Sequence, residues 1–149
     1  GDSHSSFHTS ISAREALADA SRREPHRIDV TTAIARGREY FLDHRLYNSH
    51  RDGTVVSPVF TRLSFTPRRH YDLLRGLDHF QATDAPWDDR FGYALDVLTG
   101  RRRSDGTWPV QQKYPGKVWF DMEMTGGPRR WNTLRALRVL RWAQRVEAR

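Results

Sequence analysis

The heptapeptide ISAREAL at residues 11–17 recurs in altered form as YDLLRGL at 71–77 and as WNTLRAL at 131–137. The three copies share a bulky residue, then Ser, Asp or Asn, three variable positions, a small residue and Leu, at a constant spacing of 60 residues. A second motif, Asp52-Gly53-Thr54, returns 53 residues later as Asp105-Gly106-Thr107. A fixed period of this kind is typical of stacked supersecondary units, each of which buries its apolar face against the next. The sequence therefore predicts a repeat protein.

Hydrophobic periodicity of 3.6 residues predicts five helices. Their expected bounds are residues 10–23, 29–46, 67–82, 88–100 and 128–146. Pro25 ends the first helix, Asp29 suits the N-cap of the second, and Gly100 suits the end of the fourth. The three copies of the heptapeptide then fall on the first, third and fifth helices, so the repeating unit is a helix pair. We expect one domain over residues 1–149, with repeats near 7–66, 67–127 and 128–149.

Two connections, 47–66 and 101–127, are long for a helical domain, and loops of this length usually contain local structure. In the second, residues 108–112 and 117–121 flank Tyr114-Pro115-Gly116, and Pro-Gly suits the central positions of a type II turn. In the first, residues 54–65 are rich in β-branched and aromatic side chains. We therefore expect short β-hairpins in the long loops of an otherwise all-α fold.

Stacked helix pairs form an α-solenoid or, with more curvature, a closed α/α toroid, and two motifs resemble those of the toroids. Ala94-Leu95 leading to Ser104-Asp105-Gly106-Thr107-Trp108 resembles the QW repeat of squalene–hopene cyclases. A more degenerate copy leads from Arg36-Gly37 to Asp52-Gly53, and the sequence GPRRWNTLR at 127–135 resembles bacterial proteins of the terpenoid-cyclase and prenyltransferase superfamily. The resemblance implies the C-terminal part of an α/α toroid, about two and a half helix pairs. It also implies that Trp108 packs near the start of the fifth helix as a structural clasp.

The catalytic motifs of this superfamily are missing. Class II terpenoid cyclases carry an Asp-rich DxDD acid, and the nearest sequence here is Asp121-Met122-Glu123. The DDxxD magnesium motif is also absent, and the carboxylates of residues 84–89 stand beside Pro86 at a helix start, where capping is expected rather than metal binding. A chain without cysteine cannot form the Asp/Cys/His zinc site of protein prenyltransferases. We expect no metal and no cofactor, and whether the chain is an enzyme stays open.

Candidate site residues lie where the repeated helices would face a central cavity. On the third helix, His79 would titrate near neutrality, and Asp72 with Arg75 would orient a proton transfer. The alternative is a solvated helix face with an ordinary salt bridge. The expected ligand-cavity residues are Tyr71, Trp131, Asn132 and Arg135. Such an aromatic lining suits an apolar or isoprenoid-like ligand, although plain packing is the simpler explanation.

The charge and hydropathy of the sequence argue against two classes of partner, nucleic acids and the membrane interior. The formal net charge is +7, but Lys113 and Lys117 are the only lysines and the arginines are spread over all predicted helices, so no nucleic-acid partner is expected. No apolar run approaches the roughly 18 residues that a membrane span requires, and the cytoplasm is the expected location.

Two functions remain open from the sequence. The first is a catalytically incomplete, terpenoid-cyclase-like toroid whose aromatic concave cavity binds an apolar small molecule. The second is a non-catalytic helical-repeat module that binds a protein or peptide. We expect that the start at Gly1 reflects either an artificial terminus or a cut from a longer protein, and both end helices carry wide apolar faces. We therefore expect a homo-oligomer, or packing against upstream repeats.

Overall fold

The computed structural model describes residues 3–49, 52–65, 70–111 and 127–149. These residues form five α-helices and one 3₁₀ helix, and they contain no β-strand: α1 Ser3–Arg23, α2 Ile28–Asp43, η1 Pro58–Thr61, α3 Leu73–Ala82, α4 Phe91–Gly100 and α5 Gly127–Glu147. The expected all-α class is confirmed.

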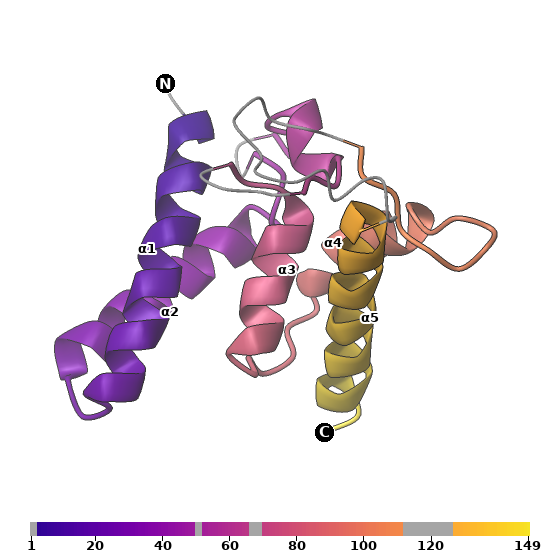
Figure 1. Ribbon diagram of the computed structural model, residues 1–149. Helices are drawn as coiled ribbons and strands as arrows, with labels where there is room; N and C mark the ends of the chain where they lie inside the picture. The colour runs from indigo at the N-terminus through magenta and orange to yellow at the C-terminus, as the bar shows by residue number, and fades with distance from the viewer. Residues whose placement is uncertain (1–2, 50–51, 66–69, 112–126) are drawn as a thin grey trace.

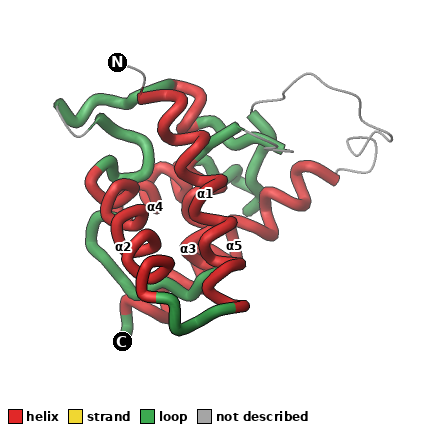
Figure 2. Tube along the Cα trace, turned by 90° about the vertical axis from the view of Figure 1, so that its left-hand side faces the viewer, coloured by secondary structure: helices red, strands yellow, loops and turns green. Residues whose placement is uncertain are grey.

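The helices form two layers. α1, α3 and α5 lie side by side and run in the same direction, whereas α2 and α4 lie behind them (Figure 1). The view turned by 90° shows α2 and α4 together on one side of the other three helices (Figure 2). α1 packs on α2, and α3 packs on both α4 and α5. The helices that carry the repeated heptapeptide thus share one layer, and the helices between them in sequence form the other.

The core is centred on Tyr71, which immediately precedes α3 and is fully buried. Its ring packs against Phe7 of α1, Phe41 of α2 and Phe60 of η1, with ring centroids 5.2–5.6 Å apart. Because a buried hydroxyl needs a hydrogen-bond partner, the Tyr71 hydroxyl donates to the Leu46 carbonyl, at 2.7 Å. Phe7, Phe41 and Phe60 thereby join α1, α2 and the loop after α2 to the start of α3.

Helix bounds differ from the predicted ones where the backbone finds a specific cap or turn. α3 begins at Leu73 rather than near residue 67, because the Asp72 carboxylate accepts the Arg75 backbone N–H at 2.8 Å, as an N-cap does. α2 ends at Asp43 rather than at residue 46, since Arg45 and Leu46 adopt positive φ angles of 49° and 69°. α1 begins at Ser3, earlier than residue 10.

The two Asp-Gly-Thr motifs form the same turn. In the first, the Asp52 carboxylate accepts the Thr54 N–H at 3.0 Å and its hydroxyl at 2.8 Å. In the second, Asp105 accepts the same two groups of Thr107 at 3.0 and 2.6 Å. The central glycines have φ angles of +71° and +84°, a region that side chains with a Cβ avoid. The 53-residue recurrence therefore reflects one local structure used twice.

The expected hairpin of residues 54–65 is not found. This segment contains η1 and no strand, and two of its residues, Val55 and Ser64, form isolated bridges, that of Val55 being antiparallel to Asn48. Pro58 provides the physical reason, because proline lacks the N–H that a strand ladder needs and favours the first turn of a helix. Of the second expected hairpin, residues 108–111 are described and form no strand, whereas residue 112, the turn at 114–116 and the partner segment 117–121 lie outside the described residues.

Trp108 joins the end of α4 to the start of α5. Its indole is fully buried, and the Nε1–H donates to the Leu98 carbonyl of α4 at 2.7 Å. Its backbone N–H donates to the Thr133 hydroxyl of α5 at 3.0 Å, and the Arg102 guanidinium lies 5.1 Å from the ring centroid. The expected packing of Trp108 near the start of the fifth helix is confirmed, and its role as a structural clasp stays a prediction.

Candidate functional site

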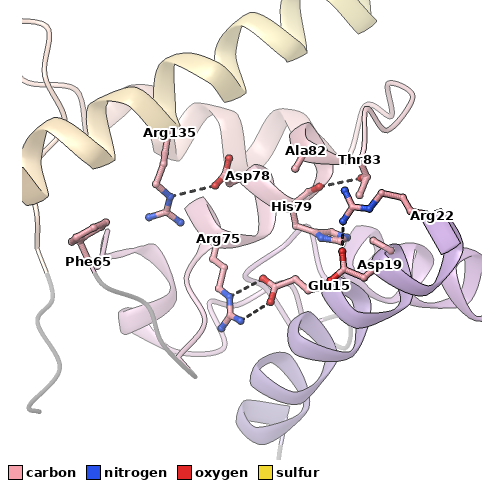
Figure 3. A pocket seen from close by; sticks show the side chains of 11 residues that line it. Glu15, Asp19, Arg22, Phe65, Arg75, Asp78, His79, Ala82, Thr83 and Arg135 are labelled. Atoms are coloured by element: carbon pink, nitrogen blue, oxygen red, sulfur yellow. Dashed lines mark hydrogen bonds and ion pairs between the residues drawn. The ribbon is translucent and has the colours of Figure 1, made fainter.

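An open cavity of about 460 Å³ lies among α1, α3 and α5. We call it the polar cleft, because charged side chains from all three helices form its wall (Figure 3). The lining residues are Glu15, Ala18, Asp19, Arg22, Phe65, Arg75, Asp78, His79, Ala82, Thr83 and Arg135. Phe65 is the one aromatic ring apart from the His79 imidazole in this described wall.

Opposite charges in the polar cleft are paired between neighbouring helices. Arg75 of α3 and Glu15 of α1 point toward each other and form a bidentate pair, with N–O distances of 3.1 and 2.9 Å (Figure 3). Arg135 of α5 contacts Asp78 of α3 at 3.4 Å between Nε and Oδ2. Glu15 and Arg75 stand 60 residues apart and therefore occupy the same position of the repeated heptapeptide. The pairs hold the layer of three helices together and leave little net charge at the mouth of the cleft.

His79 forms the junction between the polar cleft and α1. The side chain is only 7% exposed, and its Nε2 accepts a hydrogen bond from the Arg14 Nε at 3.2 Å. Burial, followed by the nearby Arg14 cation, lowers the pKa of His79 from 6.5 to about 4. The imidazole is therefore neutral at pH 7, which differs from the expected titration near neutrality.

The three candidates for proton transfer do not act as one group. Asp72 is fully buried, and its carboxylate accepts the Arg75 N–H, the Ser64 N–H and the Ser64 hydroxyl. This carboxylate therefore caps α3 and does not line the cleft. The Arg75 side chain is held by Glu15 and by the His70 carbonyl, at 2.9 Å from Nη1. Arg75 and His79 share the cleft wall, but no carboxylate orients His79 for proton transfer among the residues that the structure describes.

The expected ligand-cavity residues are dispersed. Tyr71 belongs to the core, and Trp131, which is 44% exposed, does not line the polar cleft. Asn132 is fully buried; its amide donates to the Pro109 carbonyl at 3.1 Å and its Oδ1 accepts from Arg135 at 3.2 Å. Arg135 alone reaches the polar cleft. The reason is the rotation of α5, which places Asn132 and Arg135 toward α3 and turns Trp131 outward.

A second cavity, of about 410 Å³, adjoins the polar cleft and shares Ala18, Arg22, His79, Ala82 and Thr83 with it. We call it the Arg14 cavity, since Arg14 forms its wall together with Ser21, Ile34 and Asp84. Arg14 did not stand out among the candidates from sequence. One signal was available: it occupies the position of the heptapeptide at which the other copies carry Leu74 and Leu134. A charged residue at an apolar position of a repeat is a local inconsistency that calls for a reason.

The carboxylates of residues 84–89 are bound by arginine and by local turns. Asp88 accepts the Arg90 backbone N–H and pairs with the Arg90 guanidinium, each at 2.9 Å. Asp89 accepts the Trp87 indole N–H at 2.8 Å, and Asp84 pairs with Arg145 at 2.6 Å. No group of three or more His, Asp or Glu side chains arranged for a metal ion occurs among the described residues. In the same part of the chain, no helix has the length and apolar character needed to cross a membrane.

Comparisons with protein-family models, with curated proteins and with solved structures found no match to this chain.

Proposed function

We propose that this chain is a non-catalytic helical-repeat module that binds a polar segment of a protein or peptide in the polar cleft. The observation that carries the proposal is the composition of the cleft wall, to which α1, α3 and α5 all contribute charged side chains. Helical-repeat arrays typically bind partners on the surface that successive repeats share. A wall of paired charges offers donors and acceptors to a peptide backbone and to polar side chains, which suits such a partner better than a hydrocarbon chain.

The chemistry of the cleft supports binding rather than catalysis. General acid–base catalysis is most efficient when the pKa of the catalytic group lies near the working pH. His79 has a pKa of about 4 and is neutral at pH 7, with its Nε2 occupied by the Arg14 donor. The neighbouring carboxylates Glu15 and Asp78 are engaged by Arg75 and Arg135. These side chains act as a fixed polar surface.

A second candidate is the apolar-ligand cavity of a terpenoid-cyclase-like α/α toroid. The arrangement of α1, α3 and α5 in one layer, with α2 and α4 in the other, favours this architecture. The repeated Asp-Gly-Thr turn also favours it. In this alternative, further helix pairs would complete the toroid and would form the cavity for the apolar ligand together with this chain. The polar cleft would then be one part of the wall of that larger cavity.

A peptide-display selection with a matched pair of variants tests the proposal. Ala82 lines the polar cleft and is exposed at the end of α3, so Ala82→Trp fills the cleft. Ala35→Trp adds the same side chain at an exposed position of α2 that lines neither the polar cleft nor the Arg14 cavity. We expect random peptides selected on the chain to lose about tenfold or more in affinity with Ala82→Trp and to change within about twofold with Ala35→Trp.

Two results would refute the binding of peptides in the cleft. One is a selection that enriches no peptide above background. The other is a set of peptides whose affinity is the same for Ala82→Trp and for the unsubstituted chain. A fluorescent C15 or C20 isoprenoid alcohol, titrated in parallel, tests the second candidate, which predicts saturable binding of the alcohol in place of peptide binding.

A further inference from the structure

Arg14 is a buried cation that has no carboxylate partner among the residues that the structure describes. The side chain is 5% exposed, and it forms no ion pair with any residue that the structure describes. On the neighbouring helices, Arg75 and Arg135 each hold a carboxylate. Arg14 instead donates from Nη1 to the Ile34 carbonyl at 2.8 Å and from Nε to the His79 Nε2 at 3.2 Å. Its guanidinium carbon lies 4.9 Å from the centroid of the Phe80 ring.

This arrangement leaves the positive charge of Arg14 uncompensated. Burial, and then the neighbouring Arg38 cation, lower the pKa of Arg14 to about 10, so the guanidinium stays charged at neutral pH. Its partners, a neutral imidazole, a carbonyl and an aromatic ring, carry no negative charge. Removing a charge from water without a counter-ion costs free energy, and an anion that binds beside the charge recovers part of that cost.

The Arg14 cavity has the size and lining for such an anion. It measures about 410 Å³, which lies in the range of small-molecule sites. Ala18, Ile34 and Ala82 supply apolar surface beside the guanidinium. The Nη2 group of Arg14 makes no hydrogen bond to a described residue, so its donors remain for a ligand. Asp84 also lines the cavity, but its carboxylate is paired with Arg145 at 2.6 Å.

We propose that Arg14 is a receptor for a carboxylate group, and that the Arg14 cavity binds a carboxylic acid with a short apolar chain. A guanidinium recognises a carboxylate through parallel N–H donors, and the small apolar wall suits an aliphatic chain of a few carbons. The acid has two possible sources, a free organic acid and the C-terminal residue of a bound peptide. The peptide source rests on the proposed function, whereas the free acid does not.

Titration with sodium hexanoate tests the carboxylate receptor, with hexanamide as the uncharged probe of equal length. Arg14→Met removes the cation, and Arg23→Met is the matched control, because Arg23 is an exposed arginine of the same helix that lines neither the Arg14 cavity nor the polar cleft. We expect millimolar, saturable binding of hexanoate, with hexanamide weaker by about tenfold or more. Arg14→Met should lose binding by a similar factor, and Arg23→Met should stay within about threefold.

Stability measurements separate a binding role from a structural one. Because Arg14 carries a buried, uncompensated charge, Arg14→Met should unfold at a urea concentration no lower than that of the unsubstituted chain. If Arg14→Met does not fold, Gly37→Ala provides an independent test, since a Cβ at Gly37 would lie 3.1 Å from the Arg14 Nη1, and the guanidinium must then shift by a few tenths of an ångström. Hexanoate should then bind more weakly to Gly37→Ala. Equal binding of hexanoate and hexanamide, or hexanoate affinity unchanged by loss or displacement of Arg14, would overturn the inference.

The two sources are distinguished with peptides from the display selection, each made with a free and with an amidated C-terminus. A preference of about tenfold for the free C-terminus, lost in Arg14→Met, assigns the peptide source. Hexanoate binding without any peptide binding assigns the free acid and refutes the proposed function alone. The carboxylate receptor alone is refuted if Ala82→Trp weakens peptide binding, C-terminal amidation leaves peptide affinity unchanged, and hexanoate does not bind.

Discussion

Replacement of Trp108 by alanine should cost about 3–5 kcal/mol of unfolding free energy, the range found for buried large-to-small substitutions of aromatic residues. The indole is fully buried between the end of α4 and the start of α5. Burying an aromatic side chain of about 200 Å² contributes roughly 5 kcal/mol at 25 cal/mol per Å². Both substitutions also remove the hydrogen bond from the indole Nε1–H to the Leu98 carbonyl. Trp108→Phe keeps most of the aromatic surface, so we expect it to cost only the loss of this hydrogen bond, about 1 kcal/mol.

The assay is urea unfolding followed by circular dichroism, which does not depend on the tryptophan that is removed. With a denaturant slope of about 2 kcal/mol per M, Trp108→Ala should lower the unfolding midpoint by about 2 M. Ile28→Ala is the control for an exposed apolar side chain, because Ile28 is 82% exposed at the start of α2, and it should cost less than about 1 kcal/mol. Equal midpoints for the two alanine variants would refute the clasp between α4 and α5.

Two further predictions concern pH and association. Because the pKa of His79 falls from 6.5 in the unfolded chain to about 4 in the fold, its stability contribution is present above pH 6.5 and is lost as the pH falls toward 4. Unfolding free energy should drop by about 2 kcal/mol between pH 7 and pH 5, and His79→Gln should remove that part of the slope. Trp131, Leu134 and Leu137 form a stripe on α5 that is 42–46% exposed, so light scattering should show a dimer that Leu134→Asp converts to a monomer. A monomer at every concentration before substitution would contradict the second prediction.

Several features followed from short-range patterns in the sequence. The five helices were predictable because apolar residues recur with the helical period, and the Asp-Gly-Thr turns were predictable as a repeat because aspartate and glycine impose local geometry. The position of Trp108 followed from its place after Asp105-Gly106, where the chain leaves one helix and approaches the next. In each case the determining interactions lie within a few residues of the motif or at the ends of consecutive helices.

The candidate site depended on interactions that the sequence does not display. Whether Asp72 is an acid or a helix cap depends on where α3 begins, and that start is fixed by Asp72 itself together with Ser64. The protonation state of His79 depends first on its burial and then on Arg14, which lies 65 residues away and approaches only when α1 packs beside α3. Tyr71 enters the core because it precedes the helix, so its side chain does not follow the helical face of Arg75.

The pairing of charges along the inner layer gives an independent argument for a special role of Arg14. Position five of the heptapeptide is Glu15, Arg75 and Arg135, and the pairs run from one helix to the next: Glu15 of α1 with Arg75 of α3, then Asp78 of α3 with Arg135 of α5. Each pair joins a carboxylate on one helix to the position-five arginine of the following helix, which orders the three helices. Arg14 stands at position four, where the later copies have leucine, and it takes no part in this series. The Arg14 side chain is held by hydrogen bonds to Ile34 and His79, and no carboxylate within the described ranges balances its charge. Real proteins tolerate such local inconsistencies mainly where binding or catalysis requires them, which supports the anion-binding role proposed for Arg14 and the adjoining cavity.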